Sequence, residues 1–297
     1  MQNKLYIAHY SELLQLLHLA NKQGILIADS GGTKTDWALQ TKETSYFFTT
    51  ESYHPTTLDH ASKLELLTFW RILTKKMKVT CHFFGAGCSS EENQVKIKTH
   101  FTTNTHFIHF EVASDLVAAG LSILGDEEGY VGILGTGSVL TYFKDTNVTK
   151  ILGGFGYLLG DEGSGYYFGK LVLQKFLNNE LSEELKTLVE NTYGTRNQLI
   201  SKSYQNDGKA FISSIQLHCE NPIIREEIDR IHSENIGLCL TNYLPKETKT
   251  TEISFVGSYA YYQQDLLKVA LENLGWKLRE VIDKPIDALT KRIRRYE

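Results

Sequence analysis

The pattern of apolar and polar positions along the chain predicts two successive series of strands and helices. Short apolar or alternating runs indicate strands, whereas apolar positions spaced three and four residues apart indicate helices. In the first half, three strands in a row are followed by helices that alternate with single strands. The predicted order is strand, strand, strand, helix, strand, helix, strand and helix, at residues 25–29, 35–39, 44–50, 56–76, 79–84, 90–101, 106–112 and 115–124.

The second half repeats this order, with several helices inserted after its opening strands. Strands are expected at 130–134 and 139–143, and a third short strand is expected near Thr149. The inserted helices and the closing elements follow at 163–178, 182–191, 195–204 and 222–242 (helices), 252–256 (strand), 259–274 (helix), 276–282 (strand) and from Pro285 (helix). Two halves with one order predict an α/β protein made of two related domains.

Residues 1–23 precede the first series and form a predicted extension. Apolar side chains recur there at helical spacing, which predicts a short helix, at Tyr6, Tyr10, Leu13, Leu17 and Ala20. The predicted domains are 24–118 and 119–297, the second with the helical insertion. The last helix of the chain could pack back on the first domain.

Glycine is concentrated in the middle of the chain, where 13 of the 23 glycines lie between Gly120 and Gly169. Two glycine-rich turns, at 29–33 (DSGGT) and 135–138 (GTGS), each join two predicted strands. Glycine permits close approach to the backbone, and the N–H groups of such turns can bind a phosphate. Neither turn leads into a helix, as the Walker and dinucleotide motifs do. Two ordinary hairpin turns are the alternative, but the pair together, with Asp29 ending a strand, favours phosphate binding.

The composition bounds the classes of function. The chain has 297 residues, a formal net charge of −4 and a pI of about 6.2, so no nucleic-acid partner is expected. Its 4 cysteines do not form a disulfide framework or a zinc-ligand spacing. No apolar run reaches the ~18 residues of a membrane helix. We therefore expect a cytoplasmic protein without a membrane partner, and a homodimer is one open alternative.

Four segments carry a resemblance to a known family: DSGGTKTDW (29–37), GILGTGS (132–138), GGFGYLLGDEGSGYYFGK (153–170) and FVGSYAYYQ (255–263). Together they resemble the BadF/BadG/BcrA/BcrD-type ATPase family and its N-acetylglucosamine kinase-like branch, within the actin/Hsp70/sugar-kinase superfamily. The resemblance implies two ribonuclease H-like domains, each βββαβαβα, with a nucleotide cleft between them. Ser30 departs from the pattern, because glycine is more usual at that position.

The resemblance also implies the residues that would bind Mg²⁺ and ATP. Asp29 would hold the metal, although a turn-forming aspartate is the alternative. The phosphate contacts would come from both turns, at Gly31, Gly32, Thr33, Thr136, Gly137 and Ser138. Gly257 and Tyr261 lie in the segment that resembles the adenosine motif.

Asp115 stands where the family places its general base, and phosphorylation of a sugar hydroxyl needs a carboxylate within hydrogen-bond reach. The alternative is that Asp115 caps the helix that follows it. The resemblance assigns the sugar contacts to His54, Gly154, Phe155, Gly156 and Asp161. His54 departs from the family, which usually carries asparagine there, and a loop-stabilising role is the alternative for Asp161.

These expectations lead to one main functional hypothesis. The chain is expected to be a sugar kinase that transfers the γ-phosphoryl group of ATP to the 6-hydroxyl of an amino sugar, N-acetylglucosamine first, with N-acetylmuramic acid or glucosamine as alternatives. A second hypothesis is an ATPase that activates a partner redox enzyme. Activator ATPases of this superfamily hold an iron–sulfur cluster through cysteines. A third is a nucleotide-binding regulatory module without catalysis.

Overall fold

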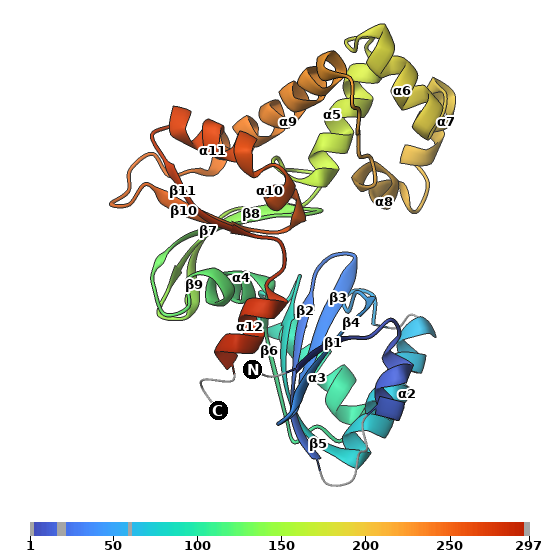
Figure 1. Ribbon diagram of the computed structural model, residues 1–297, viewed down its shortest axis with the longest axis vertical. Coiled ribbons are helices and arrows are strands. Elements are labelled where there is room, and N and C mark those ends of the chain that lie inside the picture. The colour runs from blue at the N-terminus through green and yellow to red at the C-terminus, as the bar shows by residue number, and fades with distance from the viewer. Residues whose placement is uncertain (1–2, 17–21, 59–60, 294–297) are drawn as a thin grey trace. The chain divides into compact units, whose positions relative to one another are not determined.

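The computed structural model describes residues 3–16, 22–58 and 61–293. Its contacts separate into two compact units (Figure 1). Unit 1 comprises Met1–Glu127 together with Pro285–Glu297, and unit 2 comprises Glu128–Lys284. The domains predicted from the sequence are regions expected to fold and function as separate parts. A division into compact units does not test that property, so the predicted ranges stay a prediction.

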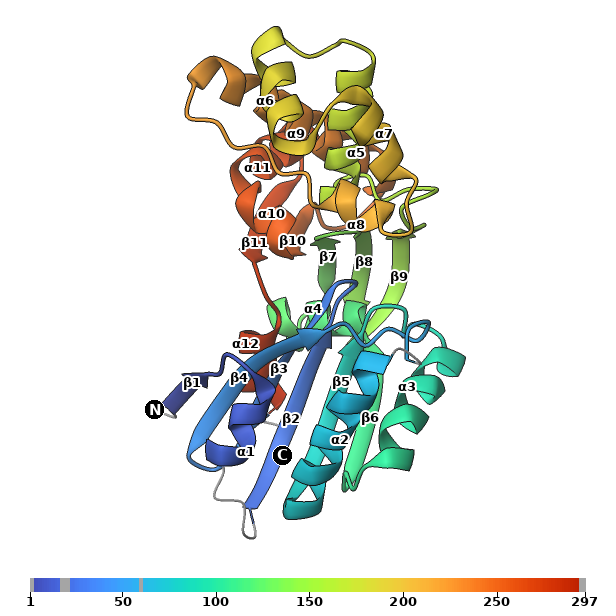
Figure 2. The same cartoon turned by 90° about the vertical axis from the view of Figure 1, so that its right-hand side faces the viewer.

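Unit 1 is built on a six-stranded sheet (Figure 2). The order across it is β1-β4-β3-β2-β5-β6, in which β2, β3 and β4 are antiparallel neighbours and the other pairs are parallel. The strands are β1 (Asn3–Tyr6), β2 (Lys22–Ser30), β3 (Lys34–Gln40), β4 (Thr44–Glu51), β5 (Met77–Gly85) and β6 (His109–Ser114). The five strands predicted between residues 25 and 112 are confirmed.

The N-terminal stretch differs from the predicted helix. Asn3–Tyr6 forms β1, which pairs in parallel with β4. Only the 3₁₀ turn η1 (Tyr10–Glu12) and the four-residue helix α1 (Leu13–Leu16) are helical. The prediction rested on side-chain spacing, whereas an edge strand is decided by a backbone partner far away in sequence. Leu17 and Ala20, which completed the predicted stripe, lie outside the described residues.

Helices cover both faces of this sheet. On one face lie α2 (Ala61–Lys76) and α3 (Glu91–Asn104), around the fully buried Trp37 and Trp70, whose ring centroids are 4.6 Å apart. On the other face lie α4 (Asp115–Ile123) and α12 (Ile286–Ile293). Their core contains buried side chains of the strands and of both helices, at Ile27, Ala38, Phe47, Phe84, Ala118, Ile286, Leu289 and Ile293.

The two faces follow from the alternation of side chains along each strand. Leu26 and Ala28 belong to the first core, whereas Ile27 between them belongs to the second. The amide Nε2 of Gln40 donates to the carbonyl of Thr290 at 2.9 Å and ties α12 to β3. The helix expected from Thr56 begins later, at Ala61.

Unit 2 is built on a five-stranded sheet in the order β11-β10-β7-β8-β9. The strands are β7 (Gly129–Leu134), β8 (Ser138–Lys144), β9 (Asn147–Gly153), β10 (Glu252–Val256) and β11 (Lys277–Ile282). Here β7, β8 and β9 are antiparallel, while β10 and β11 join in parallel. Apart from β1, both sheets thus have one strand order and one set of pairings, which confirms the predicted repetition.

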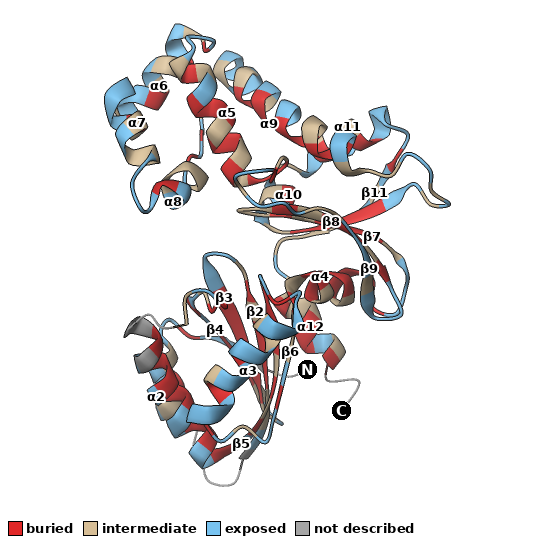
Figure 3. Cartoon of the chain, turned by 180° about the vertical axis from the view of Figure 1, so that it is seen from behind, coloured by how far each residue is buried: buried red, intermediate tan, exposed pale blue. Residues whose placement is uncertain are grey.

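The helices of unit 2 are α5 (Gly165–Leu177), α6 (Glu183–Tyr193), α7 (Arg196–Ser203), α8 (Gly208–Ser213), α9 (Pro222–Tyr243), α10 (Ser258–Tyr262) and α11 (Gln264–Asn273). Buried residues run along α5 and α9 (Figure 3), which share a core with α6 and α7. The sequence analysis missed α8. It also predicted one helix at 259–274, which the structure breaks at Gln263. Among the described residues, no helix has both the length and the apolar character needed to cross a membrane.

Candidate active site

In unit 1, the carboxyl ends of β2, β5 and β6 gather the first predicted site residues at one edge of the sheet. Ser30 lies opposite Gly85 in the strand register, and Gly85 lies opposite Ser114. Asp29 precedes the first of these residues, and Asp115 follows the last. Adjacent strands are about 4.8 Å apart, so the two backbones are separated by about 10 Å, which two converging side chains can span. Ligands of open α/β sheets bind at this kind of edge.

The first turn is anchored from behind by hydroxyl groups. The Oγ of Ser30 and the Oγ1 of Thr35 lie 2.7 Å apart, and both residues are fully buried. The N–H of Tyr53 donates to Ser30 Oγ at 3.1 Å. The Oγ of Ser52 donates to the carbonyl of Gly31 at 2.6 Å. Ser30 therefore ties the turn to the segment after β4.

The packing of the protein does not explain why positions 31 and 32 are glycines, because a side chain would fit at both. A Cβ on Gly31 would meet nothing closer than the carbonyl of Lys34 at 3.8 Å, and a Cβ on Gly32 would meet nothing within 4 Å. Neither glycine has a left-handed backbone. Thr33, at the tip of the turn, is exposed. The turn therefore leaves free space in which a ligand can approach the backbone N–H groups.

The charges around Asp29 are predominantly negative. Burial is the main cause that raises the pKa of Asp29 to about 7, the charges of Asp115 and Asp36 add to it, and Lys34 opposes it. Asp36 lies directly opposite Asp29 in the hairpin, so both side chains leave the same face of the sheet. Its carboxylate binds Lys34 Nζ at 3.2 Å and accepts from Thr49 Oγ1 at 2.6 Å. The sequence analysis missed Asp36, which a register count outward from the turn could have found.

Asp115 is the first residue of α4, and Ser114 is the residue that caps this helix. The Oγ of Ser114 accepts from the N–H of Leu116 at 3.2 Å and donates to Asp115 Oδ1 at 3.1 Å. The alternative that Asp115 itself caps the helix is therefore wrong. Burial raises the pKa of Asp115, while the hydrogen bond from Ser114 and the nearby backbone N–H groups oppose the shift.

His54 follows β4 and lies against the loop after β5. Its Nδ1 is 2.7 Å from Thr56 Oγ1. A Cβ on Gly87 would come within 2.5 Å of His54 Nε2, and Gly87 has a φ of +77°. Gly87 thus provides the room that the imidazole ring occupies. His54 therefore contacts the loop after β5, the strand that lies between those that lead to Asp29 and Asp115.

The second turn belongs to unit 2 and is supported by backbone hydrogen bonds. The N–H of Gly135 donates to the carbonyl of Gly137 at 3.0 Å. The N–H groups of Gly165 and Tyr166, at the start of α5, donate to the carbonyls of Gly135 and Thr136 at 2.8 and 3.3 Å. A Cβ on Gly135 would meet nothing within 4 Å. This turn is therefore backed by a helix and also leaves free space at its first glycine.

Asp161 lies against this second turn. Its carboxylate Oδ1 accepts from the N–H of Ser138 at 3.3 Å, and a Cβ on Gly137 would lie 3.2 Å from its Oδ2. Asp161 is buried and has a φ of +66°. Burial raises its pKa, while the Ser138 N–H and the charge of Lys209 oppose the shift. The structure thus assigns Asp161 a loop-stabilising contact, and its contact with a sugar stays a prediction.

The predicted sugar segment before Asp161 has an unusual backbone. Gly154 and Gly156 have φ values of +72° and +78°, a region that favours glycine. A Cβ on Gly154 would also lie 2.9 Å from Val139 Cγ2. The ring of Phe155, between the two glycines, is 62% exposed. An aromatic side chain exposed to this extent is available to a ligand.

Gly257 joins the end of β10 to α10, next to the second turn. It has a φ of +117°, and a Cβ there would lie 2.5 Å from the carbonyl of Leu134, the residue before the turn. Its N–H donates to the carbonyl of Ile282 at 2.9 Å. Tyr261 lies in α10, with 42% of its surface exposed. Unit 2 therefore brings together the second turn, Asp161 and Gly257.

The carboxylates of unit 1 fit a partial magnesium site. In the part of the chain that the structure describes, no three acidic, histidine or cysteine side chains converge closely enough to hold a metal by themselves. Magnesium is usually bound through one or two carboxylates together with phosphates and water. Burial chiefly raises the pKa of Asp29, and a divalent cation would offset the further contribution from the charges of Asp115 and Asp36.

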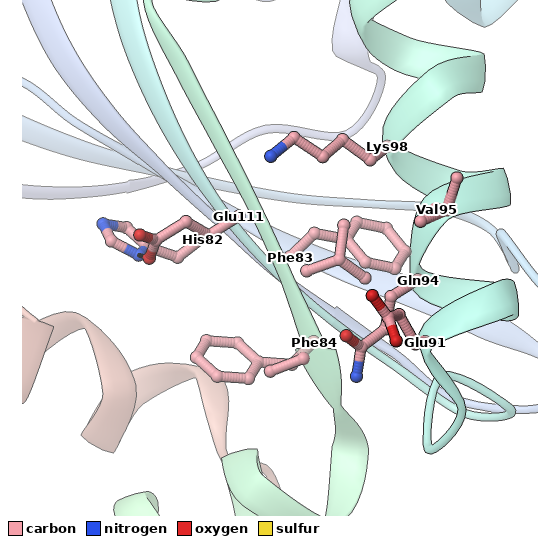
Figure 4. A pocket seen from close by; sticks show the side chains of 10 residues that line it. His82, Phe83, Phe84, Glu91, Gln94, Val95, Lys98 and Glu111 are labelled. Carbon is pink, nitrogen blue, oxygen red and sulfur yellow. Dashed lines mark ion pairs between the residues drawn. The ribbon is translucent and has the colours of Figure 1, made fainter.

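A pocket of about 400 Å³ in unit 1 has none of these predicted site residues in its lining (Figure 4). It straddles the edge strand β6 and is lined by His82, Phe83, Phe84, Glu91, Gln94, Val95, Lys98, Glu111, Val112 and Ala113. His82 Nδ1 pairs with Glu111 Oε2 at 3.3 Å, so these polar groups satisfy each other. We therefore place the candidate site at the strand ends and not in this pocket. At the strand ends, carboxylates lie near a turn whose glycines leave room for a ligand.

Comparisons with known proteins bear on the fold. A scan against protein-family models finds no match, and a search of curated proteins finds none either. Solved structures do match. A candidate N-acetylglucosamine kinase from Porphyromonas gingivalis superimposes with a TM-score of 0.77 at 25% identity, covering 91% of this chain and 99% of that chain.

Two further structures extend the match at lower identity. A candidate N-acetylglucosamine kinase from Chromobacterium violaceum has a TM-score of 0.64 at 16% identity, covering 91% of this chain and 98% of that chain. A ROK family protein from Streptococcus pneumoniae, solved with sucrose, has a TM-score of 0.50 at 13% identity, covering 91% and 99%. With its two sheets of one strand order, the chain has the fold of these proteins, the actin-like ATPase fold that its sequence predicted.

Proposed function

We propose that the chain is an ATP-dependent sugar kinase that transfers the γ-phosphoryl group of ATP to the 6-hydroxyl of N-acetylglucosamine, as a member of the N-acetylglucosamine kinase-like branch of the BadF/BadG/BcrA/BcrD-type ATPases. The observation that carries the proposal is the edge of the unit 1 sheet. There two half-buried carboxylates, Asp29 and Asp115, lie beside a turn whose glycines no neighbouring protein atom requires. The similarity to the Porphyromonas gingivalis kinase structure supports it.

The nucleotide is assigned to the two turns and to the segment after β10. Backbone N–H groups at Gly31 and Gly32 and the hydroxyl of Thr33 donate to phosphate oxygens, as do the residues Thr136, Gly137 and Ser138 of the second turn. Gly257 and Tyr261 receive the adenosine. Asp29 holds Mg²⁺, which, when bound, neutralises charge on the phosphates.

Asp115 is assigned as the general base. The sugar hydroxyl oxygen forms a bond to the γ-phosphorus, the bond from that phosphorus to the bridging oxygen of ADP breaks, and the hydroxyl proton passes to Asp115. A carboxylate whose pKa is raised by burial is a stronger base than an exposed one, and Ser114 holds it in place through its hydroxyl. His54, Gly154, Phe155, Gly156 and Asp161 are assigned to the sugar.

The alternative of an activator ATPase with an iron–sulfur cluster fits the donor set poorly. Cys81, Cys88 and Cys239 are buried, and they belong to the apolar cores of two different units. Burial raises the pKa of Cys88 to about 12, which disfavours the thiolate that a cluster needs. Only Cys219 is partly exposed among the four.

The test is a coupled ADP-release assay with magnesium-ATP and a panel of N-acetylglucosamine, N-acetylmuramic acid, glucosamine and glucose. The proposal expects ADP release that depends on N-acetylglucosamine, with the product phosphorylated at the 6-hydroxyl. A preference for another member of the panel would correct the substrate. ADP release that ignores every sugar would make the protein an ATPase and overturn the proposal.

A further inference from the structure

A buried asparagine in α9 contacts the predicted sugar segment, although no motif in the sequence indicated it. Asn235 is fully buried. Its Oδ1 accepts from the N–H of Gly163 at 2.7 Å, and its Nδ2 donates to the carbonyl of Ser164 at 2.9 Å. A backbone N–H can only donate and a carbonyl can only accept, so these two partners fix which way the amide is turned.

The second proton of the Asn235 amide continues the network to α10. Nδ2 also donates to the Oη of Tyr259 at 2.8 Å, so the tyrosine hydroxyl is left to donate elsewhere. The Nδ1 of His232 lies 2.8 Å from the same Oη and takes the role of acceptor. His232 is held by stacking on Phe168, with ring centroids 3.8 Å apart and planes 6° from parallel.

The state of His232 agrees with this direction of donation. Burial lowers the pKa of His232 to about 4, so its imidazole is neutral at neutral pH and can accept through Nδ1. Every hydrogen bond from His232 through Tyr259 to Asn235 then has one donor and one acceptor. A fully satisfied buried network of this kind fixes one local geometry.

The segment held by Asn235 is the one that contacts the second turn. Asp161 accepts from the N–H of Ser138, and the carbonyl of Glu162 accepts from Ser138 Oγ at 2.6 Å. Gly163 has a φ of +87°, and a Cβ there would lie 2.7 Å from Cys239 Cβ, so the backbone packs tightly on α9. Gly163 therefore lies between its contacts with α9 and the two preceding residues, which contact the turn.

We propose that Asn235 is a positioning residue of the kinase, which fixes the backbone at Gly163 and Ser164, and that the hydroxyl of Tyr259 holds Asn235 in that role. The kinetic part of this inference rests on the proposed sugar kinase function. Neither residue touches a predicted ligand directly. Tyr259 lies two residues after Gly257, so one network supports both the sugar segment and the start of the adenosine segment.

The decisive variant is Tyr259→Phe, which removes one hydroxyl and keeps the ring. The matched control is Tyr262→Phe, which removes a hydroxyl from the same helix at a side chain that is 75% exposed. Amide hydrogen exchange at Gly163 should become roughly tenfold faster in Tyr259→Phe, because its acceptor is less firmly held, and stay unchanged in Tyr262→Phe. Unchanged exchange at Gly163 in folded Tyr259→Phe overturns the inference, whatever the protein catalyses.

The kinetic readout separates positioning from general stability. In Tyr259→Phe, KM for N-acetylglucosamine should rise roughly threefold to tenfold, since a hydrogen bond contributes about 0.5–1.5 kcal/mol, while kcat stays within about twofold. A fall in kcat together with equal increases in KM for the sugar and KM for ATP would contradict a positioning role. If the wild type phosphorylates no sugar, the proposed function fails, and the exchange measurement alone decides whether Asn235 and Tyr259 position this segment.

A second variant covers the asparagine itself. Asn235→Asp keeps an oxygen for the Gly163 N–H and replaces the amide donor by an acceptor that faces the carbonyl of Ser164. We expect a larger increase in Gly163 exchange than in Tyr259→Phe. A folded Asn235→Asp protein with wild-type exchange and wild-type KM for the sugar would overturn the assignment of Asn235.

Discussion

The turn of unit 1 and the turn of unit 2 share one strand–turn–strand design, but they are supported by different chemistry. The first is anchored by the hydroxyls of Ser30 and Ser52 and lies among the carboxylates of Asp29, Asp36 and Asp115. The second is supported by backbone N–H groups at the start of α5. One carboxylate, that of Asp161, accepts from the N–H of Ser138 in this turn. The carboxylates are thus concentrated around the turn of unit 1, whereas the turn of unit 2 is held mainly by backbone hydrogen bonds.

The largest expected effect tests the charged side of this comparison. Asp115→Asn removes the proposed base and keeps the size of the side chain, while Ser114 still caps α4. We expect kcat for sugar phosphorylation to fall by at least roughly 10²-fold, with the KM for ATP nearly unchanged. The control is Glu111→Gln, an exposed acid in β6, the strand that leads to Asp115, and it should keep wild-type activity. A folded Asp115→Asn enzyme with most of its kcat would remove Asp115 from the base role.

The next effect tests whether the first turn serves a ligand. A Cβ on Gly32 meets no protein atom within 4 Å, so Gly32→Ala should fold as the wild type does. If phosphates approach this backbone, the added methyl group should raise the KM for ATP roughly tenfold, the equivalent of about 1.4 kcal/mol. Gly237→Ala, in α9, also places its Cβ in open space and serves as the control. An unchanged KM for ATP in Gly32→Ala would exclude close phosphate contact at this turn.

A third effect concerns stability and pH. The pKa of Asp29 is raised from 3.8 to about 7 in the folded protein, so ionising this carboxyl costs stability as the pH rises from about 4 to about 7. Without magnesium and nucleotide, Asp29→Asn should therefore be more stable than the wild type at pH 8, by on the order of 1–3 kcal/mol, and should show no gain near pH 4. Urea unfolding at both pH values measures this difference.

The same experiment on unit 2 sharpens the comparison. Burial also raises the pKa of Asp161, but the Ser138 N–H donates to its carboxylate and Lys209 opposes the shift. Asp161→Asn should therefore gain less at pH 8 than Asp29→Asn does. Equal gains at pH 4 and pH 8 for Asp29→Asn would show that its charge is not the cause.

The smallest expected effect concerns His54, for which the sequence resemblance leads us to expect asparagine. His54→Asn should change the KM for N-acetylglucosamine by roughly twofold to fivefold and leave the KM for ATP unchanged, because the amide offers different hydrogen-bond geometry. His218→Asn replaces an exposed histidine of unit 2 and is the control. If neither KM changes in His54→Asn, this residue does not contact the sugar.

The fold could be predicted largely from local patterns, with failures where distant partners decide. The strand runs around Ile27, Phe47 and Phe255 are apolar and short, and all became strands of the two sheets. Tyr6 was expected to begin a helix, yet it ends a strand whose backbone pairs with another about 40 residues away. The helix at 259–274 carries no glycine or proline that would have indicated its break at Gln263.

The site was predictable only where glycine and aspartate mark a turn. Asp29 and the glycines after it could be found in this way, because such residues at the end of a strand have few other uses. Asp36 looked like an ordinary strand residue until the hairpin register placed it opposite Asp29. Asn235 lies 72 positions from Gly163, and only packing of α9 brings the two together. A buried polar residue on a helix gives no sequence signal of its partner.

The return of α12 to unit 1 has a consequence for synthesis of the chain. Ile286, Leu289 and Ile293 complete a core whose other members, such as Ile27 and Phe47, leave the ribosome before unit 2 does. Until α12 emerges, that face of the first sheet lacks part of its apolar cover and is exposed to premature association. Unit 2, which is contiguous in sequence, can fold meanwhile. The sheet of unit 1, which is translated before unit 2, therefore receives the last part of its core after unit 2 has been made.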